Sequence, residues 1–391
     1  MDFKLGEDQI LLKSMVRDFA EKVIQPLVRE HDEEEKYPPQ SVIKQASEIG
    51  LVSLTMPEEY GGTDLDYVSA AIVVEELSRV CVGFADAITA RTFGFGIIHK
   101  YGTEEQKKKY LPPLATGESA VASALTEPDA GSDLASIKTK AVEKDGSYMI
   151  NGEKTFITNG GIADFMIVAT KTSPEKKHRG ITLFIVDSNQ QGVESRPLKN
   201  KLGVRASDTA SITFDDVIVP KDMVLGEIDR GFYQLMEFLD TERMYIAAQS
   251  VGIAQGAFEA ALKYSKDRVQ FGNPIFNFQA IQFKLADMAT EIESARLLTY
   301  KAAALLDEKE GSKVAEDISE MALASSMAKL YASHVAVKCA SEAIQIHGGY
   351  GLMKDYPVEK FYRDAKVMEI YEGTSEIQRL VIAKQLSKMM L

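Results

Sequence analysis

The chain has 391 residues, of which 45% are hydrophobic and 26% charged, a composition typical of folded proteins with roughly two to three domains. Its 58 acidic residues outnumber 45 basic ones and give a formal net charge of -13, which argues against nonspecific binding to nucleic acid. Its two cysteines are too few for a disulfide framework and lack metal-ligand spacing, so we expect neither disulfides nor a metal site.

The first part of the chain is predicted to be a helical domain over residues 1–117. Apolar residues recur every three or four positions over 8–29, and similar patterns cover 40–49 and 66–80. This is the period of one helical face. At 103–106 a threonine precedes a glutamine by three positions, a capping box that marks a further helix start.

The N-terminal sequence is acidic and amphipathic, unlike a signal peptide or an Arg-rich transit peptide. No apolar run reaches the roughly 18 residues that a membrane span needs. We therefore expect no membrane insertion and a cytoplasmic location in a bacterium or archaeon. The mature chain of a mitochondrial matrix protein is the alternative.

The middle part, over 118–228, changes to a period of two and is predicted to be an antiparallel sheet or small barrel. Its β-branched and aromatic runs are 165–170, 181–186 and 212–219. Two turn pairs, Asp145-Gly146 and Asn151-Gly152, supply residues that accept the positive φ angles of tight hairpins.

Helical spacing returns in the last part, which is predicted to be a C-terminal domain over 229–391. Three long segments cover 231–266, 279–308 and 313–346, and a final helix follows Thr374. Long helices joined by short breaks predict an antiparallel four-helix bundle. The order helix, sheet, helix indicates an α+β multidomain protein and excludes the strand–helix alternation of a parallel Rossmann sheet.

Two motifs of the sheet region combine glycine with hydroxyl groups. In 125–133, LTEPDAGSD, glycine lets the backbone approach a ligand closely while Ser and Thr offer hydrogen bonds. A plain turn is the alternative. In 154–161, KTFITNGG, an aromatic residue and two hydroxyls alternate before a glycine turn. That aromatic side chain is either a core residue or a platform for ring stacking.

Two further motifs lie at predicted helix ends. Arg268 in 267–272, DRVQFG, is able to clamp a phosphate in a bidentate manner. Its alternative role is that of a C-terminal cation that favours the helix dipole. The segment 345–351, QIHGGYG, ends the third long helix, where glycine ordinarily serves as a cap.

A fifth motif, near the C-terminus, holds a candidate base. Glu372 lies between Tyr371 and Gly373, just before a helix that Thr374 or Ser375 is able to cap. Apolar surroundings disfavour a charged carboxylate, so its pKa rises toward the range of a general base. A solvated loop glutamate is the alternative.

Together and in this order, the five motifs resemble those of the acyl-CoA dehydrogenase family of flavoproteins, over essentially the whole chain. The resemblance implies the α, β, α fold of that family and FAD bound between the middle domain and the C-terminal bundle. It implies that a neighbouring subunit of a homotetramer, a dimer of dimers, supplies part of the site. It also implies a role in fatty acid β-oxidation, with electrons passed to an electron-transfer flavoprotein.

The resemblance assigns cofactor-binding residues position by position. In the middle domain they are Ser123, Leu125, Thr126, Gly131, Ser132, Phe156 and Thr158, at the flavin and the thioester chain. In the C-terminal domain they are Arg268, Gln270, Phe271, Phe278, Gln345, Gly348, Gly349, Thr374 and Glu376. Many members have Trp in place of Phe156, so the ring contact is kept here while the indole N–H is lost.

By the same resemblance, Glu372 matches the base that removes the α-proton of an acyl-CoA thioester. Hydride then passes from the β-carbon to flavin N5, which yields the trans-2-enoyl-CoA. Some members carry the base at the position of Glu242 instead, and this chain has glutamate at both positions. Two carboxylates in one pocket raise each other's pKa, so we expect only one to be ionised. We favour Glu372 because its surrounding motif is intact.

The resemblance also implies residues that bind the substrate. They are Ser132, Gly373 and, at the CoA moiety, Asp240 and Arg243. The acyl tail is expected to meet the segment 83–99, where Asp86 and Arg91 recognise a polar acyl end, pair with each other or face solvent. Short, branched, cyclic and dicarboxylic acyl groups all stay open.

Two other classes of function remain. An acyl-CoA oxidase or a flavin monooxygenase on the same fold uses oxygen as the electron acceptor, and a noncatalytic flavin-binding homologue lacks the base. Oxidases of this type are usually longer than this chain, and monooxygenase relatives lack the glutamate. The intact motif around Glu372 argues against a noncatalytic role.

Overall fold

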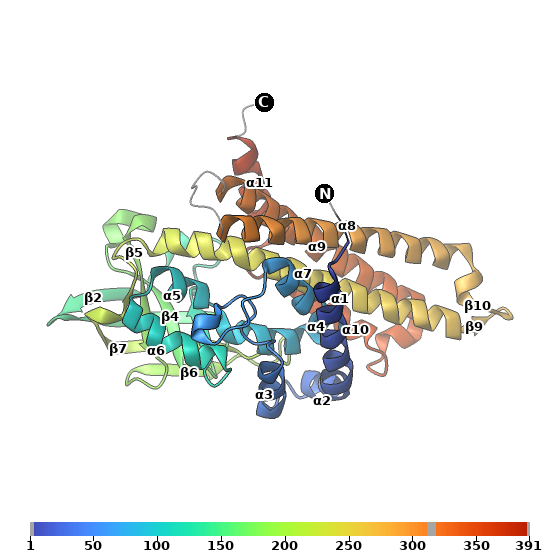
Figure 1. Cartoon of the computed structure of the whole chain (residues 1–391), viewed down its shortest axis with the longest axis horizontal. Helices are drawn as coiled ribbons and strands as arrows, with labels where there is room; N and C mark the ends of the chain where they lie inside the picture. Colours follow the sequence, from blue (N-terminus) through green and yellow to red (C-terminus); the bar gives the residue numbers. More distant parts are fainter. Residues whose placement is uncertain (1–3, 311–317, 389–391) are drawn as a thin grey trace.

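The computed structural model describes residues 4–310 and 318–388, and it confirms the predicted order of helices, sheet and helices. Figure 1 shows the strands of the large sheet gathered at one end of an elongated molecule, with the long C-terminal helices reaching toward the other end. The N-terminal helices are α1 (Glu7–Phe19), α2 (Val28–Glu33), α3 (Gln40–Glu48), α4 (Tyr67–Thr89), α5 (Phe95–Tyr101) and α6 (Glu104–Ala115).

Two N-terminal helices differ in detail from the predicted segments. The helix predicted over 8–29 continues from α1 through a π-helical turn, Ala20–Ile24, and a 3₁₀ turn that contains Pro26. Because proline has no N–H, the regular α-helical hydrogen bonds are interrupted there before α2 begins. Helix α4 extends beyond the predicted 66–80 as far as Thr89 and passes through a non-helical backbone conformation at Cys81.

The predicted capping box is confirmed. The backbone N–H of Gln106 donates to Thr103 Oγ1 at 3.2 Å, and the backbone N–H of Thr103 donates to Gln106 Oε1 at 3.0 Å. Two otherwise free donors at the start of α6 are thereby satisfied.

The middle part is an eight-stranded sheet with the order β6-β7-β3-β2-β4-β5-β8 and with β1 paired to β4. It is mostly antiparallel, as predicted, but β1 and β2 run parallel to β4. The strands are β1 (Val121–Ala124), β2 (Lys140–Lys144), β3 (Ser147–Thr158), β4 (Phe165–Lys171), β5 (Ile181–Asp187), β6 (Val193–Pro197), β7 (Thr209–Pro220) and β8 (Val224–Leu225).

One of the two predicted turns is confirmed and the other is wrong. Asp145 and Gly146, with φ angles of 49° and 80°, connect β2 to β3. Asn151 and Gly152 lie inside β3, where the register against β7 shifts between residues 150 and 152. A Cβ atom on Gly152 would lie 2.4 Å from Thr139 Oγ1, so the glycine serves a close backbone approach.

The C-terminal part is a bundle of long helices. Its helices are α7 (Gly231–Asp267), α8 (Gln279–Glu310), α9 (Ile318–His347), α10 (Val358–Met368) and α11 (Ser375–Leu386), and a short hairpin, β9 (Val269–Gln270) with β10 (Asn273–Pro274), follows α7. The start of the predicted segment 313–346 lies outside the described residues, and α10 was not among the predicted helices. Helix α7 packs against α4, α8 and α9, and their buried apolar residues share one core.

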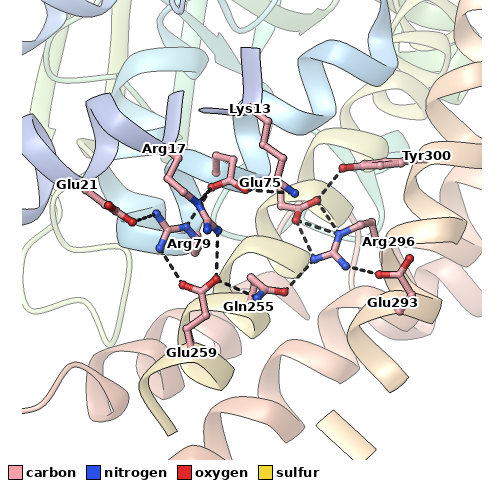
Figure 2. Close-up of polar contacts among 11 residues, drawn as sticks. Lys13, Arg17, Glu21, Glu75, Arg79, Gln255, Glu259, Glu293, Arg296 and Tyr300 are labelled. Carbon is pink, nitrogen blue, oxygen red and sulfur yellow. Dashed lines mark hydrogen bonds and ion pairs between the residues drawn. The ribbon is translucent and has the colours of Figure 1, made fainter. Parts of the chain in front are cut away.

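A buried network of charges joins the N-terminal helices to the bundle (Figure 2). Glu75 of α4 is 2% exposed and accepts hydrogen bonds from the Arg296 guanidinium, at 2.9 and 3.0 Å, and from the Tyr300 hydroxyl at 3.1 Å. The adjacent Glu76 pairs with Arg17 at 2.9 Å. Since each buried carboxylate has cationic partners from other helices, the network fixes α4 against α1 and α8.

Among residues 4–310 and 318–388, no helix combines the length and the apolar character that crossing a membrane requires. Both cysteines, Cys81 and Cys339, are buried free thiols.

Candidate active site

A narrow cavity of about 70 Å³ lies where the N-terminal helices, the sheet and the bundle meet. Its walls are largely apolar and include Val52, Leu54, Phe93, Phe95 and Ile246. Four polar residues that the sequence singled out also line it, namely Asp86, Thr158, Glu242 and Glu372. Residues from three separate regions of the chain are therefore brought to one enclosed space.

Glu372 reaches the cavity from the loop between α10 and α11. Burial raises the pKa of Glu372 to about 7, although the positive charges of Lys329 and Arg243 act in the opposite direction. A carboxyl group with this pKa is readily ionised near neutral pH and still basic enough to accept a proton. The backbone of Glu372 is left-handed, with φ of 50°, and Gly373 follows at 95°. Glycine accepts such an angle freely, whereas glutamate adopts it only when contacts hold it there.

Glu242 lies on α7 and faces the same cavity. Burial raises the pKa of Glu242 well above its usual range, and the charges of Glu372 and Asp86 raise it further. The charges of Lys329 and Arg243 favour the ionised form of Glu372, whereas the charges of Glu372 and Asp86 disfavour that of Glu242. The two glutamates are differentiated by their environments, which is the pattern expected of an acid–base pair with separate roles.

Asp86 belongs to a chain of hydrogen bonds at the cavity wall. Ser207 Oγ donates to Asp86 Oδ2 at 2.8 Å, and Gln249 Nε2 donates to Asp86 Oδ1 at 3.2 Å. The Tyr371 hydroxyl in turn donates to Gln249 Oε1. Burial nevertheless raises the pKa of Asp86. Asp86 is thus buried and hydrogen-bonded to Ser207 and Gln249, so the expectation that it faces solvent is wrong, while recognition of a polar acyl end stays a prediction.

Arg91 is buried but is not among the residues that line the cavity. Its guanidinium donates to the carbonyl of Gly117 at 3.1 Å and to the Tyr37 hydroxyl at 3.3 Å. The expectation that Arg91 faces solvent is wrong, because its exposed fraction is 6%. Through these contacts Arg91 connects segments of the N-terminal part that are far apart in the sequence.

Asp240 and Arg243 form an ion pair one turn apart on α7. Both side chains are buried. The Arg243 charge acts to lower the pKa of the nearby Glu372, against the larger effect of burial. Their role at the CoA moiety stays a prediction.

The two motifs of the sheet region lie side by side. The backbone N–H of Thr155 donates to the carbonyl of Thr126 at 2.9 Å, so the loop 125–133 lies beside the end of β3. Phe156, in β3, has φ of 57° and is 70% exposed. A large apolar ring held outward beside a loop of hydroxyl groups is suited to stacking on a planar cofactor. Its alternative as a core residue is wrong.

The other expected residues of this region share the same neighbourhood. Ser123 lies on β1, and its hydroxyl donates to the carbonyl of Phe93 at 3.3 Å. Leu125 accepts a hydrogen bond from Lys154 through its carbonyl. A Cβ atom on Gly131 would meet nothing within 4 Å, and the adjacent Ser132 is exposed, so this part of the loop borders open space.

A buried ion pair, which the sequence did not predict, supports these motifs. Lys154 Nζ lies 2.8 Å from Glu127 Oε1, and the Glu127 carboxylate also accepts the backbone N–H groups of Lys138 and Thr139. Burial lowers the pKa of Lys154 to about 8, against the attraction of Glu127. The glutamate of LTEPDAGSD is therefore a structural residue that ties the loop to β3.

A second hollow, of about 480 Å³, lies at the far end of α7. Its lining includes Arg268, Gln270, Gly348 and Gly349, and neither glycine would bring a Cβ atom within 4 Å of a neighbour. The Arg268 guanidinium lies over the Tyr350 ring, 5.5 Å from its centroid. A guanidinium beside accessible backbone fits a pyrophosphate group, so the donor set suits the dinucleotide part of FAD.

The remaining expected residues of the bundle lie near helix ends. Phe271 is 93% exposed on the β9–β10 hairpin, and its ring meets that of Phe278 edge to face at 6.1 Å. Gln345 and Glu376 are exposed, and Thr374 Oγ1 caps α11 by accepting the N–H of Ile377. The high exposure of the Phe271 ring suits a contact with a ligand or another copy.

The two groups of expected FAD residues are far apart in one chain. Glu242 borders the first cavity, and α7 continues from there to Asp267, beside Arg268. At a rise of about 1.5 Å per residue, this stretch of helix is about 40 Å long. Figure 1 shows β9 and β10 at the end of the molecule opposite the sheet. The two groups therefore lie toward opposite ends of the same chain.

Sequence reasoning missed Lys329, which lies beneath the Glu372 loop and is buried. The sequence held one signal for it, since Lys329 occurs in a run of Ala and Ser on the apolar face of a long helix. Burial of a lysine ammonium group costs free energy unless the group has partners, so such a position predicts acidic neighbours. Gln249 was also missed, and the sequence holds no comparable signal for it.

The chain is similar in sequence to known proteins. Three family models match the chain in sequence: the acyl-CoA dehydrogenase N-terminal domain over residues 6–118, the middle domain over 122–217 and the C-terminal domain over 229–387. The short-chain specific acyl-CoA dehydrogenase of Clostridium acetobutylicum is 44% identical, over 98% of this chain and 99% of that protein.

Two solved structures are also similar over their full lengths. Butyryl-CoA dehydrogenase from Megasphaera elsdenii has a TM-score of 0.93 and 40% identity, covering 99% of this chain and 100% of that one. A chain in a structure of the electron transferring flavoprotein of Acidaminococcus fermentans has a TM-score of 0.94 and 43% identity, covering 100% of both chains.

Proposed function

Because the chain belongs to the acyl-CoA dehydrogenase family, we propose that it oxidises a short acyl-CoA thioester to the trans-2-enoyl-CoA. It is an FAD-dependent oxidoreductase that acts on a CH–CH group, and it passes electrons to an electron-transfer flavoprotein. The short acyl group is supported by the short-chain specific relative.

We propose Glu372 as the base that removes the α-proton. The single observation that carries this assignment is the contrast between the two glutamates of the cavity. Burial raises the pKa of Glu372 to about 7 against the charges of Lys329 and Arg243, while burial and the charges of Glu372 and Asp86 raise the pKa of Glu242 well above its usual range. Because nearby cations favour the ionised form of Glu372, we assign the role of base to Glu372.

The surrounding residues prepare the site for a difficult deprotonation. Apolar walls such as Phe93, Phe95 and Ile246 exclude water, which strengthens every electrostatic interaction within the cavity. Arg243 and Lys329 oppose the effect of burial on Glu372 and so favour its ionised form. When bound, FAD supplies the acceptor for the hydride.

We further propose that the complete FAD site is formed by two copies of the chain. Phe156, Thr158 and the 125–133 loop of one copy hold the flavin, and Arg268, Gln270, Gly348 and Gly349 of the other hold the dinucleotide. The separation of about 40 Å along α7 supports this arrangement, as does the exposure of Phe156 and Phe271. A homotetramer, typical of the family, satisfies it. The bacterial relatives support a place in the bacterial cytoplasm.

An anaerobic titration tests the function. The flavin-loaded protein is mixed with straight, branched, cyclic and dicarboxylic acyl-CoA thioesters, and bleaching of the flavin absorbance is recorded. We expect bleaching with a short acyl-CoA and slow reoxidation when oxygen is admitted. Rapid peroxide formation would instead identify an oxidase, and the absence of bleaching with every thioester would identify a noncatalytic homologue.

A further inference from the structure

A buried lysine directly supports the loop that carries Glu372. Lys329 lies on α9, its side chain is 0% exposed, and its Nζ donates to the carbonyl of Gly373 at 2.7 Å. Gly373 is the residue after the proposed base. An ammonium group is rarely enclosed in this way without a role for its charge.

The loop needs such support because of its backbone conformation. Glu372 and Gly373 are consecutive left-handed residues, which for glutamate is unfavourable without holding contacts. Gln378 Nε2 donates to the carbonyls of Glu372 and Gly373, at 3.2 and 3.0 Å. Lys329 therefore acts from α9 and Gln378 from α11 on the same short segment, and together they fix where the carboxyl group lies.

The charges around this segment come from three helices, α4, α7 and α9. Lys329 on α9 and Arg243 on α7 favour the ionised form of Glu372, whereas Asp86 on α4 disfavours it. Glu242, across the cavity, is itself affected by Glu372.

Lys329 is subject to a similar balance. Burial lowers the pKa of Lys329 to about 8, and the Arg243 charge acts in the same direction. The charges of Glu372, Glu369 and Glu376 act in the opposite direction. The ammonium form therefore persists at neutral pH. Among the charges that lower the pKa of Glu372 against the effect of burial, that of Lys329 is the strongest.

We propose that Lys329 is a positioning residue for the base, one that holds the loop through the Gly373 carbonyl and keeps the Glu372 carboxylate ionised through its charge. This rests on the assignment of Glu372 as the base. Lys329 does not line the cavity, so it acts on the reaction through Glu372 and not through contact with the substrate.

Two substitutions separate the charge from the hydrogen bond. Lys329→Gln removes the charge and keeps an N–H donor, and Lys329→Met removes both. Lys338→Met is the matched control, because Lys338 lies on the same helix, is exposed and pairs with Glu291 at the surface. Should Lys329→Met fail to fold, Lys329→Gln still reports the effect of the charge.

The first measurement is an infrared titration of the Glu372 carboxyl group, with the spectrum of Glu372→Gln subtracted. Loss of a close opposite charge raises the pKa of a carboxyl group by about one pH unit or more. We expect that shift in both Lys329 variants and not in Lys338→Met. The pH profile of flavin reduction by a short acyl-CoA should move in the same direction.

Unchanged titration midpoints in both folded Lys329 variants would overturn the proposal. A shift in Lys329→Met without one in Lys329→Gln would also overturn the role of the charge. The infrared titration does not depend on turnover. A protein that bleaches with no thioester would therefore refute the proposed function while the titration still decides the effect of Lys329 on Glu372.

Discussion

Glu242 and Glu372 line one cavity from different elements, and the charge of Glu372 raises the pKa of Glu242, which burial has already raised well above its usual range. The two carboxyl groups are therefore not interchangeable, although both have the chemistry of a base. Lys329 and Arg243 favour the ionised form of Glu372, whereas Glu372 and Asp86 disfavour that of Glu242.

The first prediction concerns which glutamate carries the reaction. Glu372→Gln should lower the rate of flavin bleaching by a short acyl-CoA about 10²- to 10⁴-fold, the usual contribution of a general base. Glu242→Gln should retain substantial activity, because burial and the neighbouring carboxylates disfavour the ionised form of Glu242. Stopped-flow absorbance gives the rates, and the visible spectrum shows that FAD is still bound. Equal losses in the two variants would contradict this ranking.

The second prediction concerns pH. Because the proposed base must be ionised and burial raises the pKa of Glu372 to about 7, kcat/KM should rise as the pH increases through about 7. The acidic limb should persist in Glu242→Gln and disappear from the residual activity of Glu372→Gln. A profile that is flat between about pH 5 and pH 8, the range in which catalytic groups usually titrate, would count against Glu372.

The third prediction tests whether two copies share a site. Arg268→Ala and Glu372→Gln should each be inactive alone, the first through weak FAD binding. In a mixed oligomer, one site combines Glu372 of the Arg268→Ala copy with Arg268 of the Glu372→Gln copy and is therefore complete. Co-expression should recover activity, measured together with the flavin content per chain. No recovery in a verified mixed oligomer would place both residues in one copy's site.

The fourth prediction concerns the charge network of Figure 2. Glu75→Leu leaves the Arg296 guanidinium without its buried carboxylate and should lower the free energy of unfolding by about 3–5 kcal/mol. Glu194→Ala is the control, since its pair with Arg196 is exposed and worth at most about 1 kcal/mol. Urea denaturation provides both values. Similar losses in the two variants would show that burial of Glu75 has no particular energetic consequence.

The fifth prediction concerns the loop beside β3. Lys154→Met should destabilise the protein by about 3–5 kcal/mol, because the buried Glu127 loses its cation. The double variant Lys154→Met with Glu127→Gln should be more stable than Lys154→Met alone, since no buried charge is left unpaired. Chemical denaturation of the unchanged protein, Lys154→Met, Glu127→Gln and the double variant gives the coupling energy. A double variant less stable than Lys154→Met would contradict this explanation.

Much of the fold was accessible from local patterns. The 3.6-residue period located the long helices, and Thr103 and Gln106 located a helix start that the structure confirms. Asn151-Gly152 was misread because the same pair suits a hairpin and a bulge inside a strand. The deciding contact, with Thr139, comes from the neighbouring strand and has no local signature.

The sequence by itself determined the α, β, α order and brought forward Glu372, Phe156 and Arg268, because each lies in a short motif whose residue types limit its chemistry. The resemblance already implied that Glu242 and Glu372 share one pocket, whereas only the tertiary structure decided that Lys329 lies beneath the loop and that Arg268 lies far from it. The physical reason is that pKa and site composition depend on burial and on charges from other elements. Those neighbours are set by how the helices pack and not by distance along the chain.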